Sequence, residues 1–178
     1  MKLSYGTSYG TRMRPLATPA AAIAAGLLLV ACSPTHPDGV ARKDPYPYWE
    51  KGAGAPEAAE FMKLRVPQGA TEVKGAVRVQ PQENVYLLSF LTDEKTAEAI
   101  ADDLRPDHPL QQQKTISSLS GDGFEHLGVA PPQELASVRT TTACPPCVGD
   151  ARRGNVQAIE IHVAEGAPDR VRVYLAAY

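Results

Sequence analysis

The sequence is poor in the residues from which catalytic and metal sites are usually built. Its 178 residues include three cysteines, four histidines and one tryptophan. No two histidines stand four residues apart, and there is no glycine-rich phosphate loop or metalloprotease helix motif. No histidine has a serine or an acidic residue at a recognisable catalytic spacing. These absences predict no catalytic residue, no metal site and no cofactor.

An excess of positive charge is also absent. The chain has 18 basic and 20 acidic residues, and residues 1–31 contribute three of the basic ones. From residue 32 onward, 15 basic residues stand against 20 acidic ones, a net charge of −5. Nucleic acids and anionic lipid surfaces select basic patches, so we predict no nucleic-acid partner. The basic pair Arg152-Arg153 is expected in a solvated loop.

The main apolar run is too short to cross a bilayer. It covers residues 20–31, whereas a spanning helix needs about 20 residues. With Lys2, Arg12 and Arg14 before it, the run has the form of a secretory signal. We therefore expect residues 1–31 to be a signal peptide that takes no part in the fold. A start at Met13 would give a more compact signal, so either Met1 or Met13 is the true start.

The run ends in Leu29-Val30-Ala31-Cys32, which resembles the lipobox of bacterial lipoproteins. The resemblance covers the N-terminal fifth of the chain, and the composition is similar to that of lipoproteins from high-GC Gram-positive bacteria. It implies cleavage before Cys32, a diacylglycerol on the Cys32 thiol, and a lipid anchor on the outer face of the cell membrane. The membrane is then one partner of the chain. The alternative is a plain secretory signal followed by a chance cysteine.

Residues 32–55 are expected to form an extended tether. Prolines at positions 34, 37, 45 and 47 interrupt this segment, and apolar periodicity is almost absent. Within it, Tyr46, Tyr48 and Trp49 form the one cluster of large aromatic side chains. They either contact a ligand or pack on the domain that follows. We expect residues 56–178 to form that single domain.

The first half of this domain predicts a helix, a hairpin and a second helix. Residues 56–64 have an early proline and apolar residues on one side, which favours a short helix. Residues 73–79 alternate and residues 85–91 are continuously apolar, so two strands joined in a hairpin are expected. Thr92 is the expected N-cap of a helix that ends before Pro106 and lies across this strand pair.

The second half predicts a loop, an edge strand and another hairpin. Residues 106–123 are expected to be a surface loop, residues 134–138 one helical turn, and residues 138–143 an edge strand. Residues 159–163 and 171–175 alternate, and each strand should be apolar on one face and polar on the other. The predicted fold class is α+β, with two layers: an antiparallel sheet of four or five strands and one or two helices on one face.

Cys144 and Cys147 enclose two prolines and are the only cysteines of the expected domain. This Cys-x-x-Cys resembles the redox motif of some thioredoxin-like oxidoreductases, but the 31 residues that follow it leave no room for that fold. A zinc site would need two more ligands, and His126 and His162 lack a known ligand spacing. Paired cysteines in an exported domain usually bridge. We therefore predict a Cys144–Cys147 disulfide, and we expect His162 to be exposed on the polar face of its strand.

The sequence does not identify the ligand or the pathway. It favours a membrane-anchored extracytoplasmic lipoprotein whose domain binds or scaffolds an unknown protein or small molecule. The alternative is a small enzyme or thiol–disulfide factor that uses Cys144 and Cys147, with His126 nearby.

Overall fold

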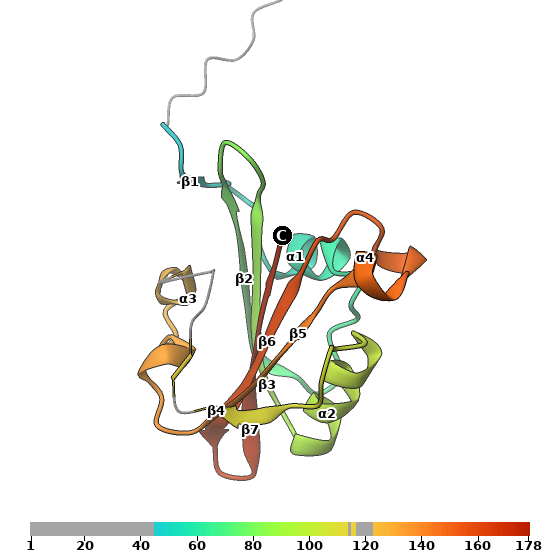
Figure 1. Cartoon of the computed structure of the whole chain (residues 1–178). Helices are drawn as coiled ribbons and strands as arrows, with labels where there is room; N and C mark the ends of the chain where they lie inside the picture. Colours follow the sequence, from blue (N-terminus) through green and yellow to red (C-terminus); the bar gives the residue numbers. More distant parts are fainter. Residues whose placement is uncertain (1–44, 114, 117–122) are drawn as a thin grey trace, which may run out of the picture. The chain divides into compact units, whose positions relative to one another are not determined.

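A computed structural model describes residues 45–113, 115–116 and 123–178. In this part of the chain, seven strands form one antiparallel sheet in the order β1-β2-β3-β7-β6-β5-β4 (Figure 1). The predicted α+β class with an antiparallel sheet is confirmed. The predicted strand number is too low, because the edge strands β1 (Tyr48–Trp49) and β4 (Gln111–Gln113) are too short to give an alternating pattern.

Both predicted hairpins are confirmed. The first joins β2 (Thr71–Val79) to β3 (Val85–Thr92), and the second joins β6 (Ile159–Ala167) to β7 (Arg170–Ala177). Strands β3 and β7 pair with each other, so the two hairpins meet in the middle of the sheet. The central strands therefore have neighbours on both edges, and their side chains need cover on both faces.

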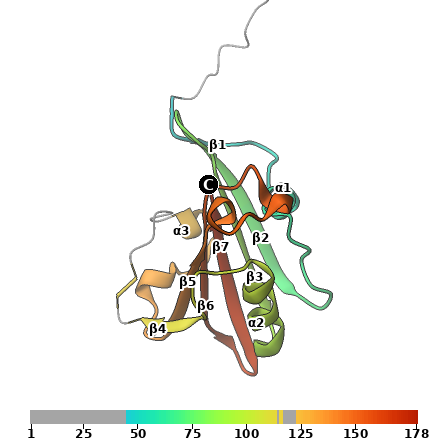
Figure 2. The same cartoon turned by 45° about the vertical axis from the view of Figure 1, so that its right-hand side comes forward.

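Two helices cover one face of the sheet, which we call the helix face. Helix α1 (Ala55–Phe61) packs on β2 and β3, and α2 (Glu94–Asp103) packs on β7 (Figure 2). The helix face has buried side chains from both helices and from alternate strand positions: Ala58, Met62, Leu88, Phe90, Ile100, Leu104, Ile159, Ile161, Val173 and Leu175. Both helices were predicted, but the strand pair β2–β3 is covered mainly by α1 rather than by the helix that follows it.

The start of α2 differs from the prediction by one residue. Thr92 is the last residue of β3, and Asp93 is the N-cap. The Asp93 carboxylate accepts hydrogen bonds from the Thr96 N–H at 2.9 Å and the Thr96 hydroxyl at 2.7 Å. An aspartate in this position satisfies a free N–H of the first turn, and these bonds hold the pKa of Asp93 below its ordinary value. Because Asp93 is the N-cap, Thr92 pairs as the last residue of β3.

The opposite face carries a second core. Its strand residues include Val85, Leu87, Tyr174 and Ala176. Above them lie the short helix α3 (Gly123–His126), which contributes Phe124, and the 3-10 helix η1 (Pro132–Glu134). Figures 1 and 2 both place α3 on the side of the sheet away from α1. The sheet therefore has cover on both faces rather than on one.

This second core overturns two predictions about exposure. Glu160 and His162 were expected on a polar, exposed strand face, but they are only 7% and 2% exposed. They point to the opposite face of β6, where the residues above the sheet exclude solvent. Apolar and polar side chains do alternate along β6, but both sets are buried, one on each face of the sheet. The alternation therefore does not separate a buried face from a solvent-exposed one.

The segment between α2 and β6 contains one more strand than expected. Strand β5 (Val138–Ala143) pairs with β6 on one side and with β4 on the other, so β5 is not the edge. The edge is β4, which lies inside the stretch predicted as a loop. The helical turn expected at residues 134–138 is the 3-10 helix η1, two residues earlier.

The signal peptide, Cys32 and residues 33–44 of the predicted tether lie outside the described residues. The end of the predicted tether is part of the sheet, since Tyr48 pairs with Val79 and Trp49 with Arg78. Among the residues that the structure describes, no helix combines the length and the apolar character needed to cross a membrane.

Candidate functional site

A groove of about 530 Å³ lies between α1 and the loop that precedes β6. We call it the α1–η2 groove, after α1 and the 3-10 helix η2 (Ala151–Arg153). Its lining comprises Glu57, Glu60, Phe61, Lys63, Tyr86 and residues 151–156. The volume lies within the range of small-molecule sites in proteins, about 300–1,000 Å³.

Two stacked aromatic rings line the groove. Phe61, at the end of α1, lies parallel to Tyr86 of β3, with 3.7 Å between the ring centroids and 7° between the planes. Each ring is only partly buried against the core of the helix face. The groove therefore offers apolar ring surface to a ligand, which is the main source of binding energy in most small-molecule sites.

The charged residues at the rim already have partners. Glu57 accepts a hydrogen bond from the Gly54 N–H at 2.7 Å, and this bond holds the pKa of Glu57 below its ordinary value. Glu60 pairs with Lys63, and the hydrogen bond from Lys63 lowers the pKa of Glu60 in the same way. Because these carboxylates are occupied, the rim favours a neutral ligand over a strongly charged one.

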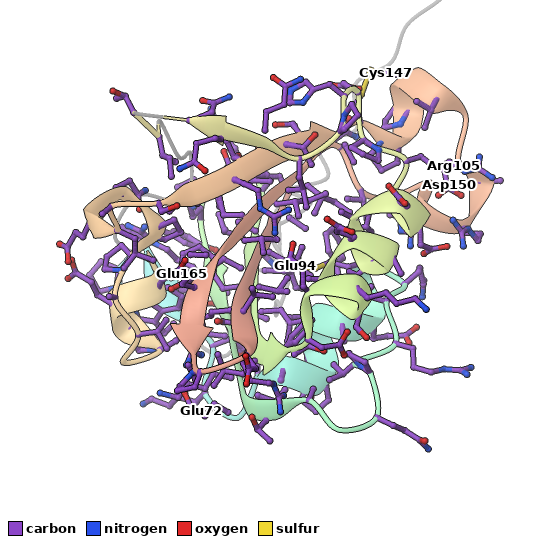
Figure 3. All side chains as sticks on the ribbon, turned by 90° about the horizontal axis from the view of Figure 1, so that it is seen from below. Glu72, Glu94, Arg105, Cys147, Asp150 and Glu165 are labelled. Atoms are coloured by element: carbon purple, nitrogen blue, oxygen red, sulfur yellow. A yellow bond between two sulfur atoms is a disulfide. The ribbon has the colours of Figure 1, made fainter. Side chains whose placement is uncertain are left out.

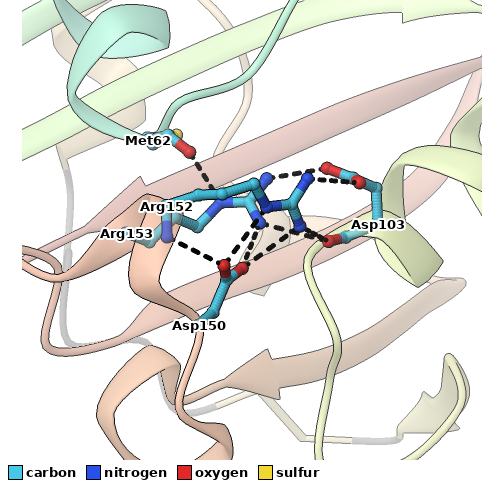
Figure 4. Close-up of polar contacts among 5 residues, drawn as sticks. All are labelled: Met62, Asp103, Asp150, Arg152 and Arg153. Atoms are coloured by element: carbon cyan, nitrogen blue, oxygen red, sulfur yellow. Dashed lines mark hydrogen bonds and ion pairs between the residues drawn. The ribbon is translucent and has the colours of Figure 1, made fainter.

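A fully buried arginine supports the loop side of the groove. The Arg153 side chain has no exposed surface, and its guanidinium donates to four acceptors (Figure 4). Its Nε donates to the Met62 carbonyl at 2.8 Å, and its Nη1 donates to Asp150 at 2.6 Å. Its Nη2 donates to the Asp103 carboxylate at 2.7 Å, and Nη1 also reaches the Asp103 carbonyl at 3.2 Å. The prediction of a solvated Arg152-Arg153 loop is wrong for Arg153.

Arg152 completes this ionic cluster from the solvent side. It is about half exposed and donates to Asp103 at 3.0 Å and to Asp150 at 3.2 Å. The hydrogen bond from Arg153 is the main cause that lowers the pKa of Asp103, and the bond from Arg152 is the main cause that lowers the pKa of Asp150. Both aspartates are thereby held ionised, and the cluster ties η2 to the end of α2 and to α1.

The cysteines brace the same loop from its other end. The Sγ atoms of Cys144 and Cys147 are 2.09 Å apart, the distance of a disulfide bond, as predicted. Cys144 is the N-cap of the single-turn helix α4 (Pro145–Val148), and Cys147 lies within this helix, which packs against η2. Figure 3 shows Cys147 and Asp150 in the same region of the molecule. The loop from residue 144 to residue 156 thus has a covalent closure at one end and a buried ionic anchor at the other.

The two histidines considered as partners of the cysteines lie elsewhere. His126 belongs to α3, and Figure 1 places α3 and α4 on opposite sides of the sheet. His162 is buried on the opposite face, away from α1 and α2. Within the described part of the chain, no group of three or more histidine, cysteine, aspartate or glutamate side chains is placed to hold a metal ion.

The predicted aromatic cluster packs on its own domain and does not line the α1–η2 groove. Trp49 stacks on His126 with 3.9 Å between ring centroids and contacts the core of the opposite face. Tyr48 is half-buried in β1, and the Tyr46 ring, 47% exposed, lies 5.6 Å from that of Tyr48. Tyr46 alone of the three presents much of its surface to solvent.

Sequence reasoning missed the residues that form the groove. Phe61 lies on the apolar side of the predicted short helix and Tyr86 lies within the continuously apolar run of residues 85–91, and both patterns indicate core packing. Arg153 carried one usable signal: Asp150 precedes it by three residues, the spacing of an ion pair across one turn. Comparisons of the chain with protein-family models, with curated proteins and with solved structures gave no match.

Proposed function

We propose that this protein is a lipid-anchored extracytoplasmic binding module whose α1–η2 groove takes a small neutral molecule. The Leu29-Val30-Ala31-Cys32 motif supports the anchor, and the net charge of −5 after residue 31 argues against a nucleic acid as the partner. The ligand class follows from the groove: stacked aromatic rings and a rim whose carboxylates are already paired.

The observation that carries the binding role is the buried Arg153 cluster behind the groove. Burial of an ion pair is costly, and such a pair contributes little to stability compared with well-packed apolar residues. Its value here is geometric, since Arg153 fixes η2 relative to α1 through the bond to Met62 and relative to α2 through the two bonds to Asp103. A pre-organised groove loses less entropy when a ligand binds.

The anchor is tested by labelling cells that produce the protein with radioactive palmitate. We expect label in the wild type and none in Cys32→Ala, which should be released from the membrane fraction. An unlabelled wild type, or a Cys32→Ala protein that stays membrane-bound, contradicts the anchor and leaves the groove to be judged by itself.

The groove is tested by NMR with the full-length, unlipidated Cys32→Ala protein and a set of neutral aromatic and carbohydrate fragments. Binding fragments should shift resonances of Phe61, Tyr86 and Asn155. Asn155→Trp adds bulk at the exposed rim and should abolish these shifts, whereas the control Glu125→Trp, at an exposed position of α3, should not. Shifts that survive Asn155→Trp, or that cluster elsewhere, contradict the groove as the ligand site.

One observation favours the alternative thiol function. Cys144 is the N-cap of α4, and a helix N-terminus lowers the pKa of a cysteine thiol. However, α4 has only four residues and ends at Gly149, so its dipole is small. A Cys144→Ser/Cys147→Ser protein separates the two roles. A brace predicts a loss of about 2 kcal/mol of stability with fragment binding retained, whereas a thiol enzyme loses disulfide exchange at unchanged stability.

A further inference from the structure

A row of polar side chains crosses the opposite face of the sheet. Ser89 of β3 stands directly across from Tyr174 of β7, Tyr174 stands across from His162 of β6, and His162 stands across from Thr140 of β5. All four are at most 9% exposed. The row joins β3 of the first hairpin, β7 and β6 of the second hairpin, and β5, so no local sequence pattern predicts it.

Several polar atoms of this face are buried without a hydrogen-bond partner. They include the Ser89 hydroxyl and both ring nitrogens of His162. The nearest carboxylate oxygen to His162 is that of Glu160, at 3.8 Å from Nε2, which is beyond hydrogen-bond distance. Each such group loses its hydration without compensation. The closed arrangement of this face is therefore less stable than an apolar face of the same shape.

The residues that cover this face are attached to it by side chains. We call residues 123–135 the cover segment. Its backbone–backbone hydrogen bonds among described residues close within the segment, as between Leu127 and Phe124 or Leu135 and Pro132. A segment without a strand ladder to the sheet can leave it without breaking the pairing of the sheet itself.

Besides its packed apolar side chains, the cover segment has two hydrogen bonds and two ring contacts with residues of the sheet. The Tyr174 hydroxyl donates to the Ala130 carbonyl at 3.1 Å, and Lys74 Nζ donates to the Gly128 carbonyl at 3.2 Å. The rings of His126 and Trp49 stack at 3.9 Å, and Phe124 meets Tyr174 edge-on at 5.1 Å. Tyr174 thus links the cover segment to the polar row, because it stands between Ser89 and His162.

We propose that the cover segment moves away from the sheet as one unit. This opening exposes the polar row to solvent, while the helix face stays closed. Opening gives water access to Ser89 and His162, which offsets part of the contact energy that is lost. The groove on the helix face keeps its shape during this opening, because its supports are the disulfide and Arg153. The inference is independent of the proposed ligand site.

Amide hydrogen exchange on the full-length Cys32→Ala protein tests this proposal. Amides of residues 124–129 should exchange at least tenfold faster than those of α2 in the same sample, because they exchange by local opening. If both sets exchange at the rate of global unfolding, the cover does not detach and the proposal is overturned.

Variants of the row and of the cover should change this opening in opposite directions. Ser89→Ala and His162→Leu remove unpartnered groups and should slow exchange of the cover amides by about fivefold or more. His126→Ala removes the ring stack on Trp49 and should accelerate it. Ser137→Ala and His108→Ala, outside the row and the cover segment, serve as controls.

Exchange of the α2 amides reports the global stability of each variant, so a variant that weakens the whole fold can be recognised. If His162→Leu or His126→Ala does so, the proposal is judged on Ser89→Ala, which is the smallest change. If the amides of the cover segment exchange at the same rate or faster in Ser89→Ala than in the parent protein, the buried polar row does not favour opening, and the proposal is overturned.

Discussion

The two faces of the sheet each bury a side chain that normally seeks water, Arg153 on the helix face and His162 on the opposite face. The nitrogens of Arg153 donate to the Met62 carbonyl, to both aspartates of the cluster and to the Asp103 carbonyl. The ring nitrogens of His162 have no hydrogen-bond partner. The two residues are almost equally buried, but their surroundings differ completely.

Charge explains why the fold treats them differently. A guanidinium is always protonated, and burying it without partners costs far more than burying a neutral polar group. The helix face therefore had to supply carboxylates to Arg153, whereas a histidine side chain, which carries no permanent charge, can be buried without partners at a smaller cost. The helix face is consequently rigid at its loop, and the opposite face carries the groups that favour opening.

Removing Arg153 should have the largest effect on this contrast. Arg153→Ala leaves the Met62 carbonyl without its donor and removes one of the two arginines that donate to the buried Asp150 carboxylate. We therefore expect a loss of about 3–5 kcal/mol in the free energy of unfolding. Urea denaturation monitored by circular dichroism measures it. Arg152→Ala, at a half-exposed position of the same cluster, should cost about 1 kcal/mol or less. Equal losses in the two variants would show that burial does not distinguish them.

The hairpins and helices could be predicted from the sequence because their signals are local. The alternation of β2, the continuous apolar run of β3 and the spacing of apolar residues in α2 each lie within a dozen residues. Arg153 could not be predicted to be buried, since its partner Asp103 is 50 residues away and its acceptor at Met62 is 91 residues away. No pattern within the loop contains that information.

The burial of His162 was missed for a related reason. Its strand alternates, and alternation indicates which positions share a face but not whether that face is covered. Residues 123–135, which pack on this face, have no helical or strand periodicity in the sequence. The groove was missed for the same reason. Phe61 and Tyr86 each lie in an apolar pattern that indicates core packing, and the sequence of neither element shows that the two rings stack beside a groove.

Added methyl groups should sharpen the contrast between the faces. A Cβ at Gly75, on the helix face, would lie 2.5 Å from the Ala55 Cα, and backbone cannot move aside cheaply. A Cβ at Gly123, on the opposite face, would lie 2.7 Å from Leu87 Cδ1, the end of a side chain. We expect Gly75→Ala to lower the melting temperature by the equivalent of about 1–3 kcal/mol and Gly123→Ala by clearly less. The reverse order would show that α1 is the more adaptable cover.

Lowering the pH should destabilise the ionic cluster on the helix face before it affects the backbone hydrogen bonds of the sheet. The pKa values of Asp103 and Asp150 are lowered in the folded protein by Arg153 and Arg152. A carboxylate with a lowered folded-state pKa stabilises the fold above its unfolded pKa, about 3.9, and this contribution is lost as the pH falls through the folded value. Asp103→Asn should therefore be less stable than the wild type at pH 7, and the difference should shrink below about pH 4.

Asp102→Asn, the neighbouring exposed position of α2, should follow the wild-type profile. Chemical denaturation at a series of pH values measures both variants, and a constant difference between Asp103→Asn and the wild type would show that the ionic cluster does not contribute to acid sensitivity.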